Sequence, residues 1–134
     1  MKINIIDLLT ESVVYKAIEE QKGLLECKFV LISDASEINF LFGPLREFNY
    51  HAKLVEHFCT QYAIPSVWSH KPDLFEMYNT SFRVNGGGWL MFDFSKGKMT
   101  IHGNSTAYGR FNESKLKTVL ESAKLNGKFE IEVK

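Results

Sequence analysis

The sequence predicts an α+β fold, with a mixed or largely antiparallel sheet and two or three packed helices. Short segments rich in Val, Ile, Leu and Phe predict strands, while longer segments repeat apolar residues at helical spacing. Glycines concentrate between Gly86 and Gly109, where we expect the backbone to turn tightly or to approach another group closely. No internal repeat or linker divides the 134 residues, so we expect one domain over residues 1–134.

The first half of the chain is expected to begin with a helix over Ile5–Lys22. Its apolar residues recur every three or four positions, and Gly23 is a natural C-cap. A strand is expected over Glu26–Ser33, which is short and apolar. Lys28 is the one charge near its start, and the pattern alone favours a solvent-facing lysine on an edge strand.

The best-supported helix is expected over Pro44–Tyr62. Gly43 and Pro44 form a helix-entry signal, and the apolar residues that follow step by three and four: Leu45, Phe48, Ala52, Val55, Cys59 and Tyr62. The segment Ala63–Pro65 ends this helix. The next segment, Ser66–Asn79, has no clean periodicity and predicts a long loop with a short helical turn around Asp73–Tyr78.

The second half is expected to be mostly sheet. A strand over Thr80–Asn85 leads into the glycine triplet, and Trp89–Phe94 and Lys98–His102 predict a hairpin with Gly97 in its turn. A helix is expected to begin at residues 112–114 and to end at residues 126–127. A final strand is expected over Lys128–Val133.

The composition argues against several classes of partner. Sixteen basic residues balance sixteen acidic ones, so we expect no nucleic-acid partner and no membrane association. Residues 1–12 contain acidic side chains and no signal-type apolar core, and no apolar run is long enough to span a bilayer. Cys27 and Cys59 lie in apolar segments, which indicates buried, reduced thiols. We expect a cytoplasmic protein, with a monomer favoured.

Four histidines are the first candidates for chemistry. His57 lies on the polar side of the second expected helix, and neither His70 nor His102 has a partner that spacing identifies. The chain has no His-Glu-x-x-His and no Cys-x-x-Cys motif, so we expect no metal and no cofactor. His51 lies at the edge of the apolar stripe, and its position alone indicates a core-edge histidine satisfied by one hydrogen bond.

The two glycine-rich segments have different patterns. The triplet 86–88 is neither a Walker loop nor a dinucleotide fingerprint, and alone it indicates a bulge or close backbone packing. The segment 103–109 follows a strand and precedes a helix, so its N–H groups can point into one concavity and cradle an anion. Ser105 lacks the Gly-x-Ser-x-Gly elbow, which disfavours a serine hydrolase.

Taken in their order along the chain, several of these features resemble the janus family, whose best-known members are the protein phosphohistidine phosphatases. The matching features are the lysine of the Lys28 strand, the triplet Tyr50-His51-Ala52, three consecutive glycines, the loop Gly-Asn-Ser-Thr-Ala-Tyr-Gly at 103–109 and a helix beginning near Glu113. The resemblance covers roughly residues 28–133, which is most of the chain.

This resemblance implies a cofactor-independent phosphatase that hydrolyses the P–N bond of phosphohistidine in a protein, or of a related small phosphoramidate. It implies that His51 is the catalytic histidine, as general base or nucleophile, and that Lys28 holds the phosphoryl group. The backbone around Ser105, Thr106 and Ala107 matches the phosphate-binding loop. Because a P–N bond is already labile, positioning and charge stabilisation can supply most of the catalysis.

The sequence departs from the family pattern in three ways. The residue after the glycine triplet is typically arginine and is Trp89 here, and a second family arginine corresponds to Gly43, with Arg46 nearby. The span between the histidine and the triplet is also longer. We expect Trp89, Arg46 and Tyr50 to line the site and phosphate binding to be weaker. The alternatives are a non-catalytic phospho-ligand or anion-binding protein of the same fold, or a purely structural interaction protein.

Overall fold

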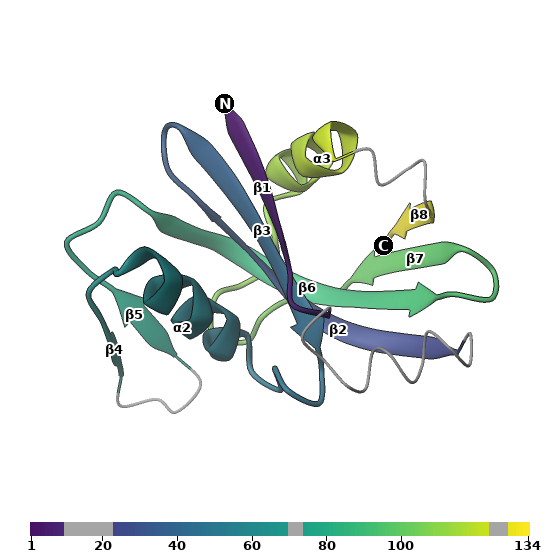
Figure 1. Ribbon diagram of the computed structural model, residues 1–134, viewed down its shortest axis with the longest axis horizontal. Coiled ribbons are helices and arrows are strands. Elements are labelled where there is room, and N and C mark those ends of the chain that lie inside the picture. The colour runs from purple at the N-terminus through teal and green to yellow at the C-terminus, as the bar shows by residue number, and fades with distance from the viewer. Residues whose placement is uncertain (10–22, 70–73, 124–128) are drawn as a thin grey trace.

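The computed structural model describes residues 1–9, 23–69, 74–123 and 129–134, and all structural statements refer to these ranges. They form a six-stranded mixed sheet in the order β1-β3-β2-β6-β7-β8, a separate two-stranded sheet of β4 and β5, and two helices (Figure 1). The large sheet contains β1 (Lys2–Asp7), β2 (Leu24–Ser33), β3 (Glu37–Pro44), β6 (Arg83–Asp93), β7 (Lys98–His102) and β8 (Glu130–Val133). The α+β prediction is confirmed.

The pairing of the strands makes β2 and β6 the centre of the sheet. The outer strands β1 and β8 run parallel to β3 and β7, whereas all other neighbours in the large sheet are antiparallel. The small sheet pairs β4 (Ser66–Trp68) with β5 (Phe75–Met77). The helices are α2 (His51–Tyr62) and α3 (Glu113–Ser122). None of the described helices is long and apolar enough to cross a membrane.

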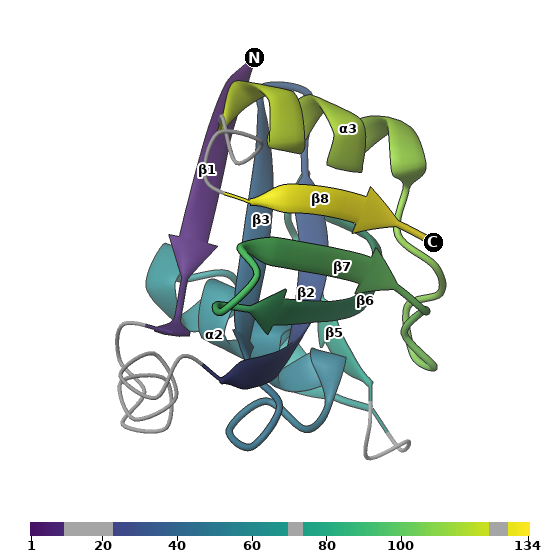
Figure 2. The same cartoon turned by 90° about the vertical axis from the view of Figure 1, so that its right-hand side faces the viewer.

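The two helices pack on opposite faces of the sheet (Figures 1 and 2). Successive side chains of a strand point to opposite faces, and β2 shows this alternation clearly. Phe29 and Leu31 are buried in the cluster that contains the apolar residues of α3, whereas Val30 and Ile32 are buried in the cluster that contains those of α2. The molecule therefore has two cores separated by one sheet.

Several predicted elements are confirmed. They are the strand that includes Lys28, the hairpin of β6 and β7, the start of the last helix and the final strand. The side chain of Asn112 accepts a hydrogen bond from the Lys115 N–H at 2.9 Å, which is the expected N-cap interaction. Helix α3 ends at Ser122, and the predicted stop at residues 126–127 lies outside the described residues.

The predicted N-terminal helix is wrong over residues 5–7. These residues belong to β1, which pairs in parallel with β3 from Lys2–Glu37 to Asp7–Phe42. Ile5 and Ile6 pack against opposite core clusters, as strand alternation requires, so tertiary pairing overrides the helical spacing. The remainder of that expected helix, residues 10–22, lies outside the described residues.

The second predicted helix begins later than expected. Gly43 and Pro44 are the last residues of β3, where Pro44 pairs with Cys27. The N–H groups of Glu47 and Phe48 both donate to the Pro44 carbonyl, at 3.1 and 2.9 Å, and form a turn between strand and helix. Helix α2 therefore starts at residue 51 and ends at Tyr62, as expected, before the left-handed residue Ala63.

The predicted loop over residues 66–79 is also wrong in part, because it contains the hairpin of β4 and β5. Phe75 is buried against α2, and Trp68 packs edge-on against it with ring centroids 5.0 Å apart. The expected helical turn around residues 73–78 is wrong, because residues 75–77 form strand β5. The tip at residues 70–73, which includes His70, lies outside the described residues.

Candidate functional site

A cavity of about 170 Å³ lies where β2, the start of α2, β6 and the 103–109 loop meet. It is lined by Lys28, Asn49, Tyr50, His51, Trp89, Asn104, Ser105, Thr106 and Ala107. Seven of the eight site residues predicted from the sequence line this cavity, although they come from distant segments of the chain. The exception is Arg46, which is exposed in the turn after β3 and does not line the cavity. Asn49 and Asn104 were missed as lining residues: Asn49 precedes the Tyr50-His51-Ala52 triplet, and Asn104 lies in the 103–109 loop but was not singled out there.

The imidazole of His51 is fixed by one hydrogen bond. His51 is the first residue of α2 and is only 6% exposed, and its Nε2 lies 2.9 Å from the Gly88 carbonyl oxygen. Because a carbonyl oxygen can only accept, Nε2 carries the proton and Nδ1 is left with its lone pair. Burial lowers the pKa of His51 to about 4, and the nearby charge of Lys28 acts in the same direction. The imidazole is therefore neutral at pH 7.

The glycine triplet creates the space for this histidine. A Cβ at Gly87 would lie 2.8 Å from His51 Cδ2, and a Cβ at Gly88 would meet the Phe111 ring at 2.9 Å on the other face. Gly86 has a φ of +84° and lies where β6 carries an extra residue relative to β2. The bulge and the close packing expected from the sequence are both present, and their result is direct contact between the histidine and the strand.

Lys28 lies on a central strand, so its predicted place on an edge strand is wrong. It pairs with Gly43 of β3 on one side and with Trp89 of β6 on the other. Its Nζ donates a hydrogen bond to the Asn49 carbonyl and lies 4.9 Å from the centroid of the Trp89 ring and 6.0 Å from that of Tyr50. Burial lowers the pKa of this ammonium group.

The loop that contains Ser105 closes on itself. The Ser105 N–H donates to the Gly109 carbonyl at 3.0 Å, and the Gly109 N–H donates to the Ser105 carbonyl at 2.8 Å. The Ser105 hydroxyl accepts from the Tyr108 N–H at 3.1 Å. The hydrogen bonds of the described chain leave the N–H groups of Thr106 and Ala107 without a protein acceptor. These two groups on the cavity wall are available to bind an anion.

The same loop is attached to the β4–β5 hairpin. The Tyr108 hydroxyl accepts from the Phe75 N–H at 2.9 Å and donates to the Phe75 carbonyl at 2.6 Å. The β4–β5 hairpin is therefore joined to the 103–109 loop.

Trp89 and Gly43, the two positions at which the resemblance implies arginine, each lie against a neighbouring residue. The Trp89 ring packs on Gly103, where an added Cβ would lie 2.8 Å from Trp89 Cδ1. The Phe48 ring occupies the space beside Gly43, because an added Cβ there would lie 2.4 Å from Phe48 Cδ2. Among the described residues that line the cavity, Lys28 alone is a cation at neutral pH. In the described part of the chain, no group of three His, Cys, Asp or Glu residues is arranged to hold a metal ion.

The sequence matches a known family. The model of the Janus/Ocnus family matches residues 22–128. Because this range covers more than half of the chain, the protein belongs to the Janus/Ocnus family, which includes phosphohistidine phosphatase. No similar curated protein was found.

Proposed function

We propose that this Janus/Ocnus protein is a cofactor-independent phosphatase that hydrolyses the P–N bond of phosphohistidine or of a related phosphoramidate. The observation that carries the proposal is the state of His51. Its imidazole is neutral, it is oriented by the Gly88 carbonyl, and it lines the same cavity as Lys28 and the Ser105–Ala107 backbone. A base or nucleophile, a cation and an anion-binding loop are the groups that phosphoryl transfer without a metal requires.

In the proposed reaction, the phosphoryl oxygens accept hydrogen bonds from the N–H groups of Thr106 and Ala107, and Lys28 neutralises part of their charge. A water oxygen bonds to phosphorus while the P–N bond breaks. Nδ1 of His51 accepts the proton of the attacking water, and that proton then passes to the departing nitrogen. The products are inorganic phosphate and free imidazole, or free amine.

The second form of the mechanism uses His51 as the nucleophile. Nδ1 then bonds to phosphorus, the substrate nitrogen leaves as the P–N bond breaks, and water hydrolyses the phosphorylated His51 in a second step. A phosphorylated enzyme trapped by rapid acid-free quenching, with the phosphate mapped to His51, would establish the nucleophilic form. Solvent oxygen isotope appears in the released phosphate in both forms, so it does not distinguish them.

The test is phosphate release from phosphohistidine and from phosphoramidate without added metal. We expect His51→Ala to lower kcat/KM by about a thousandfold or more, because it removes the group that accepts the proton or the phosphoryl group. His57→Ala is the matched control, since His57 lies on the same helix, is only half-buried and does not line the cavity. Full turnover by His51→Ala would disprove the proposal.

One observation supports an alternative, a non-catalytic protein that binds a phosphorylated ligand or another anion. Within the described cavity lining, Lys28 is the one cationic group, and Trp89 and Gly43 occupy positions of family arginines. Fewer cations stabilise less of the charge that develops in the transition state. Under this alternative, phosphate shifts the amide signals of Thr106 and Ala107, His51→Ala weakens that binding, and no phosphoramidate is hydrolysed.

A further inference from the structure

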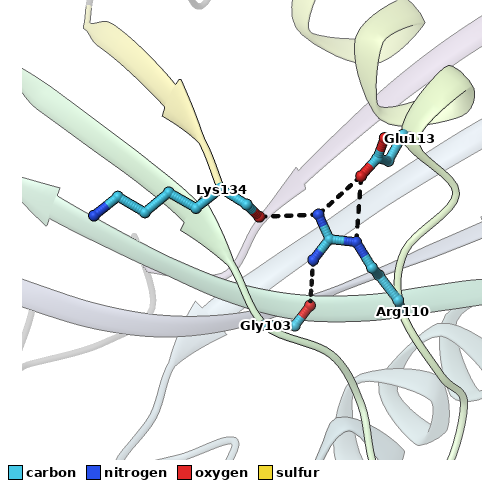
Figure 3. A network of polar contacts seen from close by, with 4 residues as sticks. All are labelled: Gly103, Arg110, Glu113 and Lys134. Carbon is cyan, nitrogen blue, oxygen red and sulfur yellow. Dashed lines mark hydrogen bonds and ion pairs between the residues drawn. The ribbon is translucent and has the colours of Figure 1, made fainter.

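We propose that Arg110 is a positioning residue that holds the phosphate-binding loop in its binding conformation, a role that rests on the proposed function. Its guanidinium donates to three acceptors from three parts of the chain (Figure 3). They are the Gly103 carbonyl at 3.2 Å, the Glu113 carboxylate at 2.8 and 3.3 Å and the Lys134 carbonyl at 2.9 Å. Arg110 thus connects the start of the loop to the first turn of α3 and to the residue after β8.

The backbone of Arg110 is itself firmly held. It forms a β-bridge with Gly87, whose N–H donates to the Gly109 carbonyl at 3.1 Å. The bulge at Gly86 packs directly against the Arg110 carbonyl, since an added Cβ there would lie 2.1 Å from that oxygen. The guanidinium also lies 4.3 Å from the centroid of the Phe111 ring, which is buried in the α3-side core. The far end of the loop is therefore anchored to β6.

The side chain of Arg110 extends this anchor back to the beginning of the loop. Residue 110 follows the loop, and Gly103 opens it, so the bond from Nη1 to the Gly103 carbonyl joins the two ends. Gly103 has a φ of +78° and contacts the Trp89 ring, which makes its position a determinant of the cavity wall. The planar guanidinium can satisfy three acceptors at once, whereas a lysine ammonium on a flexible stem does not present the same fork.

The expected consequence is an effect on binding rather than on the chemical step. The loop N–H groups contact the phosphoryl oxygens both in the bound substrate and in the transition state. A loop whose ends separate loses both interactions together, which raises KM and leaves kcat nearly unchanged. Arg110 itself does not line the cavity and needs no contact with substrate.

The experiment compares Arg110→Ala with Glu113→Gln and Arg83→Ala. We expect Arg110→Ala to raise KM for phosphohistidine about five- to tenfold with kcat within about twofold. Its affinity for inorganic phosphate, measured from the amide shifts of Thr106 and Ala107, should fall by a similar factor. Glu113→Gln removes the charged partner of Arg110 but keeps the bond from Arg110 to the Gly103 carbonyl. Arg83 is an exposed arginine whose side chain, among the described contacts, bonds only to its neighbour Phe82. Both control variants should therefore keep KM and phosphate affinity within about twofold of wild type.

Chemical rescue distinguishes loss of the guanidinium group from a general destabilisation of the variant. The Arg110 side chain is 41% exposed, so methylguanidinium from solution can reach the position that the deletion leaves. Millimolar methylguanidinium should lower KM of Arg110→Ala and have no such effect on wild type. Unchanged KM and phosphate affinity in Arg110→Ala would overturn this inference while the proposed function stands. A wild-type protein that neither binds phosphate nor hydrolyses phosphohistidine would overturn both.

Discussion

The two faces of the sheet are built differently. The α3 side buries a cluster of apolar side chains, in which Phe29, Phe40, Phe42 and Phe92 form a chain of rings with successive centroids 5.2, 5.5 and 5.9 Å apart. The α2 side also buries apolar residues, but it includes the fully buried Asn39 and, at the start of the helix, the buried His51. Both faces bury apolar side chains, and the second face also accommodates a buried amide and a buried imidazole.

The difference shows how the site is made from the fold. Helix α2 begins over Gly87, and the next pair of residues on the same face of the sheet, Lys28 and Trp89, is only half-buried beside it. Asn39 is satisfied by the Asn4 amide at 2.9 Å and by its own bond to the Ile32 carbonyl at 3.2 Å. Nδ1 of His51, by contrast, is left with its lone pair. Among the hydrogen bonds of the described residues none reaches Nδ1, so a free acceptor lies at the end of the α2 face that borders the cavity.

Removing a ring from the α3 side should have the largest effect on stability. Phe40 is fully buried, so Phe40→Ala should lower the free energy of unfolding by about 3–5 kcal/mol, because it deletes a large side chain and leaves a cavity. Chemical denaturation measures this loss. Phosphate release per folded molecule should stay near the wild-type value, since Phe40 is on the opposite face from His51. A loss of unfolding free energy below about 1 kcal/mol would contradict the buried, well-packed environment of Phe40 on the α3 side.

The pH dependence of stability should come largely from the α2 side. The pKa of His51 is about 4 in the folded protein and near its ordinary value of about 6.5 in the unfolded chain, so the unfolded chain binds more protons between these values. The free energy of unfolding should therefore fall as the pH is lowered through this window, by on the order of 3 kcal/mol in total. NMR titration of the imidazole measures the folded pKa.

The control for this titration is His51→Gln, which should flatten the pH dependence of unfolding across the same window. Because Nδ1 stays unprotonated down to the folded pKa, kcat/KM should hold from neutral pH to about pH 5 and fall near pH 4, after subtraction of spontaneous hydrolysis. A folded-state titration near pH 6.5 would mean that the histidine is solvated and would contradict its buried environment.

A smaller change, the addition of one methyl group at Gly87, should lower the rate of the chemical step. In Gly87→Ala the added Cβ would lie 2.5 Å from the Phe29 carbonyl oxygen and 2.8 Å from His51 Cδ2, so the imidazole must shift. We expect kcat to fall about tenfold to a hundredfold, as small displacements of a catalytic group do. Gly97→Ala is the control. Nothing lies within 4 Å of its added Cβ, and its φ of +63° gives it a backbone cost without an effect on kcat.

Local signals predicted part of this fold correctly. The strand over residues 26–33 and the hairpin around Gly97 depend on β-branched residues and a turn glycine, and the start of α3 depends on the Asn112 cap. The order of motifs identified the family, and five of its expected site residues line one cavity: Lys28, His51, Ser105, Thr106 and Ala107. Their roles stay predictions until the variants are measured.

The errors have a common physical cause, which is pairing between residues far apart in the chain. The strand β1 exists because β3 pairs with it, and Pro44 ends a strand because its neighbour is Cys27. The central position of Lys28 likewise depends on partners on both sides. Arg46 was expected near the site from its place in the sequence, but the turn after β3 leaves it exposed. The sequence pattern within one segment does not identify the distant segment with which it pairs.

The central position of β2 has a consequence for how the protein folds. Lys28 and Trp89 become neighbours only when β2 pairs with β6, and closing a loop of that length costs chain entropy before any contact forms. His51 gains its acceptor at Gly88 through the same pairing. The cavity therefore forms in the step that joins the two halves of the chain, and a nascent chain that stops before β6 contains the histidine but cannot hold it in place.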